Sequence, residues 1–239
     1  MKKINCVWML AFAGMLFHAQ ALEMDSNGCI QADSLRFSVS CVTPGWKQTV
    51  SQSSLPGQVT KDSGATEYRC ETRFPLPDQA EGILQETFRR KSETEWDLQA
   101  ELNFPRPVQT ARVMLEATLP NALFDGETLQ VNSSAVQLPE NASRSGKILL
   151  YRGKATELII PLKESLLRFR GDFELHLQDN SKWKFPGYSL RILFTPSEGE
   201  LQQARLSLII SQIPYRSKPL DLRAGFNREF RDQQAEDGV

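Results

Sequence analysis

The sequence predicts an all-β protein, an antiparallel β-sandwich of jelly-roll type whose strands occupy residues 30–214 of a domain spanning 22–214. Apolar and polar residues alternate with period 2 over most of this range, as in strands with one buried face. Turn residues recur about every 8 to 12 positions, the spacing typical of sandwiches and barrels. No long segment has the 3.6-residue period of a helix, which argues against a βαβ protein.

Four alternating stripes in the first half each put one apolar face inward and one polar face outward, as a half-solvated antiparallel sheet requires. They lie at residues 35–41, 68–74, 96–104 and 113–119. We expect Pro105 and Pro107 to end the third stripe, because proline cannot donate to a strand ladder. Residues 51–64 are rich in Ser and Gly and predict a loop.

The second half carries shorter apolar runs, with turns predicted at Asn132-Ser133 and at Asp179-Asn180. The total is roughly a dozen strands. Inward parity selects a set of residues expected in the core: Leu98, Leu102, Val113, Leu115, Leu175, Leu206 and Leu208.

The first 21 residues have the pattern of a secretory signal peptide. Lys2 and Lys3 precede an apolar run at 7–17, which is too short to cross a bilayer, and Ala19-Gln20-Ala21 supplies a small-x-small cleavage site. We therefore expect cleavage after Ala21, a secreted or periplasmic product, and no integral membrane segment after cleavage. An uncleaved N-terminal anchor is the alternative.

Composition excludes several classes. The 28 basic and 29 acidic residues give a net charge of −1, without the basic excess of a nucleic-acid binder. Only two histidines occur, and His18 lies in the leader. His176 lies between two leucines, so it is expected on the outer face of its strand. We predict no metal and no cofactor.

Cys29, Cys41 and Cys70 remain after the leader, an odd number that allows at most one disulfide. Their spacing matches no zinc pattern. Packing as small buried apolar residues is the preferred interpretation, although a disulfide between two of them stays open.

No catalytic constellation is evident, since nucleophile-elbow, phosphate-loop and H-E-x-x-H motifs are absent. Acidic residues two positions apart put both carboxylates on one strand face, a pattern more typical of a solvated sheet surface than of a glycosidase acid pair. These pairs are Glu93 and Glu95, Asp172 and Glu174, and Glu198 and Glu200.

Aromatic side chains are the better candidates for binding, because sugars stack on flat rings. Trp46 follows a Pro-Gly turn, and Trp183 and Tyr188 flank a Lys-rich hairpin. We predict Trp46, Trp183 and Tyr188 as carbohydrate-stacking residues. The alternative, a core anchor, applies strongly to Trp96 and also to Trp183.

Two stretches resemble a known kind of protein. The C-terminal extension at 215–239 contains Asp221-Leu222, Asn227, Phe230, Asp232 and Asp237-Gly238, and it is similar to an interdomain junction in large secreted bacterial glycan-degrading proteins. Residues 124–139 resemble a short hairpin common in their sandwiches. The resemblance implies an N-terminal accessory domain of glycoside-hydrolase-type machinery, truncated at the junction, with further catalytic domains as partners. It carries over no catalytic residue.

Two functions follow. The first is an exported, non-catalytic β-sandwich module associated with polysaccharide binding or degradation. The second is a self-contained glycoside hydrolase or other hydrolase on the same scaffold. Two carboxyl groups roughly 5 to 10 Å apart in a cleft would favour the hydrolase.

Overall fold

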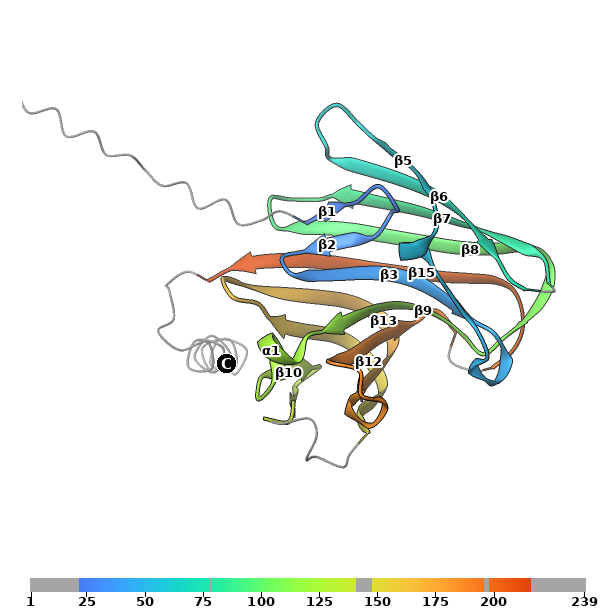
Figure 1. Ribbon diagram of the computed structural model, residues 1–239. Helices are drawn as coiled ribbons and strands as arrows, with labels where there is room; N and C mark the ends of the chain where they lie inside the picture. Colours follow the sequence, from blue (N-terminus) through green and yellow to red (C-terminus); the bar gives the residue numbers. More distant parts are fainter. Residues whose placement is uncertain (1–21, 78, 141–147, 196–197, 216–239) are drawn as a thin grey trace, which may run out of the picture.

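The computed structural model describes residues 22–215 except 78, 141–147 and 196–197. The predicted signal peptide and the junction-like residues 216–239 lie outside this range. The chain forms antiparallel strands in one strongly curled sheet (Figure 1), so the all-β antiparallel prediction is confirmed. Helical structure in the described residues is limited to α1 (Asn121–Phe124) and three 3-10 turns, η1 (Pro44–Trp46), η2 (Gln52–Ser54) and η3 (Ser181–Trp183).

The strands follow the alternating stripes of the sequence. In chain order they are β1 (Glu23–Met24), β2 (Ile30–Ala32), β3 (Leu35–Val42), β4 (Thr49–Ser51), β5 (Gly57–Lys61), β6 (Glu67–Pro75), β7 (Glu81–Arg90), β8 (Glu95–Thr110), β9 (Arg112–Leu119), β10 (Thr128–Val131), β11 (Ser134–Gln137), β12 (Leu149–Pro161), β13 (Ser165–Asp179), β14 (Tyr188–Leu193) and β15 (Gly199–Pro214).

The fifteen strands of the described residues belong to one hydrogen-bonded network, whose main path has the order β1-β2-β3-β9-β14-β13-β15-β8-β7-β6-β5. Strand β4 bonds to β3, while β12 and the β10–β11 hairpin extend from β13. Strand β13 joins the two halves of the network, because residues 165–170 bond to β15 and residues 174–179 bond to β14. The opposing layers expected from the sequence are therefore parts of a single curled sheet.

A bulge marks the place where β13 changes partners. The β12–β13 register shifts between Ala155 and Glu157, opposite Gly171. Gly171 has φ +157°, and a methyl group there would lie 2.8 Å from the backbone oxygen of Ser207 on β15. Only glycine lets the backbones approach so closely at this bulge.

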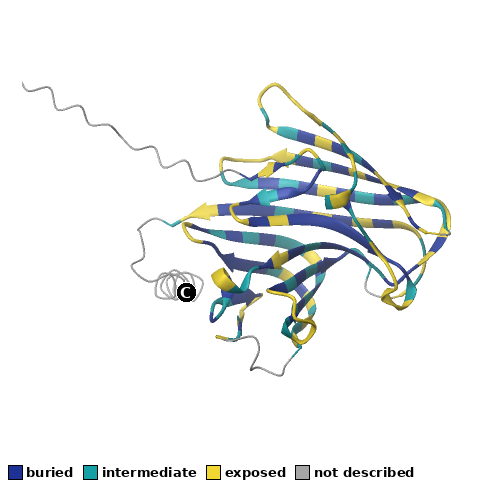
Figure 2. Ribbon diagram, in the orientation of Figure 1, coloured by how far each residue is buried: buried dark blue, intermediate teal, exposed yellow. Residues whose placement is uncertain are grey.

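The core lies inside the curl, and buried and exposed residues alternate along the strands (Figure 2). Phe37 on β3 contacts Phe169 on β13, with ring centroids 5.0 Å apart, and so connects the two halves. Trp96 is buried and stacks on Phe88, as a core anchor should. Every residue in the predicted core set is buried: Leu98, Leu102, Val113, Leu115, Leu175, Leu206 and Leu208. The three cysteines are also buried, as free thiols.

A buried polar contact connects β3 to β7, two strands far apart in the sheet order. Gln52 of η2 accepts a hydrogen bond from the Val39 backbone N–H at 3.0 Å and donates one to Glu86 on β7. The pKa of Glu86 is raised to about 8, mainly by burial, with a smaller contribution from nearby Asp25 and against the opposing effect of the Gln52 hydrogen bond. We call Gln52 and Glu86 the seam pair, because they bridge the two halves of the curl.

Two local expectations were wrong. Strand β8 continues through Pro105 and Pro107 to Thr110, because its pairing with β7 ends at Asn103 and its register with β15 shifts at the same place. Prolines are tolerated where no ladder N–H is needed. The segment 51–64 contains η2 and β5 rather than a loop alone.

One of the two predicted turns is present, and a longer loop replaces the other. Asn132, with φ +54°, turns β10 into β11 as expected. After Asp179 the chain forms η3, and the partner strand starts only at Tyr188, so the second connection is a longer loop. Among the described residues, no helix is long and apolar enough to cross a bilayer.

Candidate functional site

Trp46 stands at the tip of the connection between β3 and β4. Gly45 and Trp46 both have left-handed backbone angles, φ +66° and +57°, an uncommon conformation for a large residue. The turn is held by Thr43, whose carbonyl accepts from Trp46 N–H at 3.1 Å and whose hydroxyl accepts from Gln48 N–H at 3.0 Å. The result is that Trp46 is 50% exposed.

The Trp46 ring lies against Arg191 of β14. The guanidinium carbon is 5.3 Å from the ring centroid, a cation–π distance. Arg191 is mostly buried, and it contacts Glu116 at 3.5 Å and Gln178 at 3.1 Å. Burial lowers the pKa of Arg191, and Glu116 opposes that shift. This arrangement fixes one side of the indole and leaves its other parts open to solvent.

Arg191 belongs to a row of polar side chains on the outer face of the sheet. Glu116, Arg191, His176 and Arg152 occupy directly paired positions on β9, β14, β13 and β12. His176 Nε2 lies 2.8 Å from Glu174 Oε1. The side chain of His176 is 14% exposed, and burial lowers its pKa although Glu174 opposes the shift.

We call these six residues the Trp46 face: Trp46, Glu116, Arg152, Glu174, His176 and Arg191. The face combines an open aromatic ring with hydrogen-bond donors and acceptors that are already oriented by one another. Sequence reasoning identified Trp46 and the outward position of His176 but missed Arg191 and Glu116. Alternation with buried Leu190 and Ile192 was the signal that could have placed Arg191 outward.

Two of the six acidic residues singled out in the sequence, Glu95 and Glu174, contact a basic side chain. Glu95 bonds to Arg170, and Glu174 bonds to His176 and lies 3.7 Å from Arg152. These contacts are typical of carboxylates that order neighbouring cations on a sheet surface. Within the part of the chain that the structure describes, no group of three or more His, Cys, Asp or Glu side chains could hold a metal ion.

Tyr188 was wrongly predicted as a stacking residue, because it is fully buried. Its hydroxyl donates to Asp125 Oδ1 at 2.6 Å and contacts the Pro139 carbonyl at 3.1 Å. Burial and this carboxylate raise the pKa of Tyr188 well above its ordinary value. The inward parity that Tyr188 shares with Leu190 and Ile192 outweighs its position after a Pro-Gly turn.

Trp183 is 55% exposed, so the core-anchor alternative fails for this residue. It lies in the connection from β13 to β14, on a different loop from Trp46. The structure therefore keeps two of the predicted stacking candidates exposed but does not bring them together in one loop.

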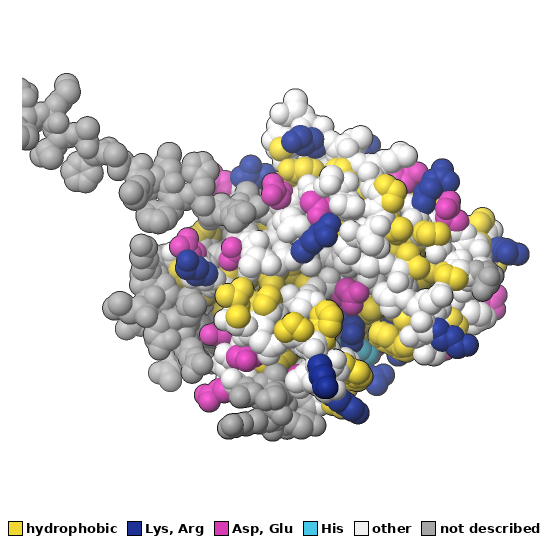
Figure 3. All heavy atoms as spheres, viewed as in Figure 1, with side chains coloured by type: hydrophobic (Ala, Val, Ile, Leu, Met, Phe, Trp, Pro, Cys, Tyr) yellow, Lys and Arg dark blue, Asp and Glu magenta, His cyan; other side chains and the backbone are white. Residues whose placement is uncertain are grey.

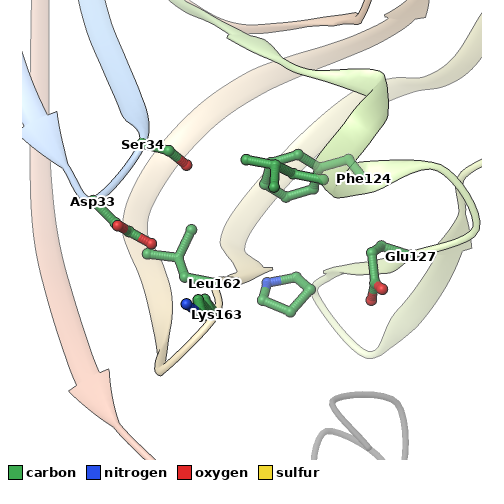
Figure 4. A pocket seen from close by; sticks show the side chains of 8 residues that line it. Asp33, Ser34, Phe124, Glu127, Leu162 and Lys163 are labelled. Atoms are coloured by element: carbon green, nitrogen blue, oxygen red, sulfur yellow. The ribbon is translucent and has the colours of Figure 1, made fainter.

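A shallow hollow of about 230 Å³ lies between the β2–β3 turn, α1 and the β12–β13 turn. Figure 4 shows Asp33 and Glu127 on opposite sides of it, with Phe124 above an apolar floor. Its lining residues are Asp33, Ser34, Leu123, Phe124, Glu127, Pro161, Leu162 and Lys163. The sequence analysis did not single out this hollow.

No family model matches this chain, and no curated protein matches it in sequence. Its function has to be argued from the geometry of its own residues.

Proposed function

We propose that this protein is an exported, non-catalytic β-module that binds polysaccharide on the Trp46 face, or supports polysaccharide degradation as an accessory domain. The observation that carries the proposal is the seating of Trp46. The Arg191 guanidinium lies over the indole, while Trp46 as a whole is 50% exposed beside polar side chains. A sugar ring needs such an apolar plane together with neighbouring hydrogen-bonding groups.

The ion pairs on this face favour binding over hydrolysis. A retaining or inverting glycosidase needs one carboxyl group to act as an acid and a second to act as a nucleophile or base. Glu174 is held by His176 and Arg152, and Glu116 lies beside Arg191. These contacts orient both carboxylates, which can then serve as fixed acceptors for sugar hydroxyl groups.

A single aromatic plane gives modest affinity. We expect dissociation constants from millimolar to micromolar, or about −4 to −8 kcal/mol. Preorganisation by the left-handed turn at Gly45 and Trp46 reduces the conformational entropy lost on binding.

The test uses a polysaccharide array followed by affinity electrophoresis on the secreted product of the full-length gene. Trp46→Ala should abolish retardation, whereas Trp46→Phe should keep part of it because a flat ring remains. Trp183→Ala is the matched control, since it removes an equally exposed indole from another loop. We expect this control to bind like the wild type.

Three outcomes would count against the proposal. A blank array removes the binding role and leaves only the accessory role. Equal loss of binding in the Trp46 and Trp183 variants would show that binding is not specific to this face. Turnover of a glycan by the purified protein, lost in Glu174→Gln, would establish the hydrolase instead.

A further inference from the structure

The loop between β13 and β14 presents two large apolar side chains to solvent. Trp183 is 55% exposed and Phe185 is 59% exposed, and they alternate with exposed Lys182 and Lys184. Figure 3 shows hydrophobic side chains lying among Lys and Arg side chains at the lower edge of the molecule, where Figure 1 places this loop. Adjacent large apolar residues on a protein surface commonly mark a contact site. We call residues 181–186 the Trp183 tip.

Hydrogen bonds and close packing at the two ends of the loop hold the Trp183 tip in place. Trp183 N–H donates to the Asn180 carbonyl at 2.9 Å, and the Asn180 side chain donates to Ser189 Oγ at 2.8 Å. Gly187, with φ +132°, packs so closely on β9 that a methyl group there would lie 2.7 Å from the Leu119 carbonyl oxygen. The turn holds the two rings in a fixed position, so binding through them loses little conformational entropy.

The chemistry of the tip differs from that of the Trp46 face. Its sequence is Ser-Lys-Trp-Lys-Phe-Pro, which contains no carboxylate or amide side chain. Asp179 and Asn180, which precede the tip in the sequence, are only 2% and 6% exposed. The tip therefore offers aromatic rings and cations but few fixed acceptors for sugar hydroxyls.

Aromatic rings beside lysines match the boundary of a lipid bilayer. Trp and Phe rings bury their apolar surface at headgroup level, and lysines extend their charged ends toward lipid phosphates. Lys182 Nζ lies 5.8 Å from the centre of the Trp183 ring, so charge and apolar surface lie side by side. The positive charges of the lysines complement the negative charge of an anionic leaflet.

We propose that the Trp183 tip contacts the surface of bilayers that contain anionic phospholipids, with Trp183 and Phe185 inserted at headgroup level and Lys182 and Lys184 on lipid phosphates. The contact is peripheral and reversible, because two side chains bury less apolar surface than a stable lipid anchor does. It is independent of polysaccharide binding, since it uses a different loop and different chemistry.

The test is co-sedimentation of the secreted protein with vesicles of phosphatidylcholine containing phosphatidylglycerol, compared with pure phosphatidylcholine. All variants are checked by mass to share one N-terminus, so that any contribution of residues 1–21 cancels. The double variant Trp183→Ser/Phe185→Ser should bind anionic vesicles at least about tenfold more weakly. Trp46→Ser, the matched control in another loop, should bind like the wild type.

A second double variant separates charge from insertion. Lys182→Gln/Lys184→Gln should lose about thirtyfold in affinity for anionic vesicles, because each lysine at such a surface contributes roughly fivefold. Its affinity for pure phosphatidylcholine should stay unchanged. Brominated lipids should quench wild-type tryptophan fluorescence and quench the Trp183→Ser/Phe185→Ser variant much less.

The proposal is overturned if the wild type does not sediment with anionic vesicles, or if both tip variants bind as well as it does. It also fails if Trp183→Ser/Phe185→Ser loses polysaccharide binding while the wild type ignores vesicles, because the tip is then a sugar site. Melting temperatures equal to the wild type verify that these exposed changes leave the fold intact.

Discussion

Replacing Glu86 with Gln tests the seam pair directly. Glu86 is completely buried on β7, and its close partner is the amide of Gln52. A carboxyl group in this position prefers to stay protonated, because ionisation would place a charge out of water. The amide of Gln has the same shape and no titration, so Glu86→Gln isolates the effect of ionisation.

The magnitude follows from the pKa. The pKa of Glu86 rises from an ordinary 4.5 to about 8 on folding, so the folded state holds a proton that the unfolded state releases between those values. The free energy of unfolding therefore falls as pH rises through this window and levels off above pH 8. Relative to its value below pH 4.5, the free energy of unfolding falls by about 5 kcal/mol at most for a pKa shift of this size, and by about 3 kcal/mol at pH 7.

The assay is urea unfolding followed by tryptophan fluorescence at pH 4.5, 7 and 8.5. The difference in unfolding free energy, variant minus wild type, should grow with pH and favour Glu86→Gln at pH 8.5. Other titrating groups cancel in this difference. Glu81→Gln, on the same strand but paired with Arg73 at the surface, is the matched control for the substitution itself. Parallel pH curves for wild type and Glu86→Gln would refute the reasoning.

Three further predictions concern packing. Leu115→Ala should lower the unfolding free energy by about 2–5 kcal/mol, whereas Leu123→Ala, on a side chain that is 56% exposed, should change it little in the same urea titration. Gly171→Ala should lower the free energy of unfolding by about 1–3 kcal/mol, because Gly171 has a positive φ and lies close to a backbone oxygen of β15. Gly199→Ala is the control, since a methyl group there meets nothing within 4 Å. Equal shifts of the melting temperature in both variants would contradict this prediction. Burial raises the pKa of the three described thiols to about 11 or 12. The folded protein should therefore resist maleimide labelling at pH 7 until urea exposes these thiols. Rapid labelling of the folded protein would disprove this prediction.

Much of the fold was predictable because strand alternation is a local property. The inward parity of Leu98 and Leu102 can be recognised within ten residues, and the structure buries both. Asn132 likewise marks its own turn. Period, turn chemistry and parity need no knowledge of distant residues.

The features missed depend on partners distant in sequence. Gln52 and Glu86 meet only because the sheet curls. Glu86 shares the inward parity of Leu84 and Phe88, but nothing local to its strand identifies Gln52 as its partner. Strand β8 continues through Pro105 because its ladders with β7 and β15 need no N–H group at that position. Trp183 was open to either interpretation, since exposure of an aromatic ring is decided by the path of its loop.

The position of β13 and β15 in the middle of the sheet has a consequence for how the chain folds. These strands come last among the fifteen, yet β15 must pair with β8 and β13 must pair with β14, β15 and β12. Strands β8 and β9, made much earlier, keep open edges until β15 and β14 respectively are available. Such distant pairing predicts slow folding, during which these edges are exposed to aggregation. A chaperone that holds the emerging chain open until β15 is available should therefore raise the yield of native protein more than a faster rate of synthesis would.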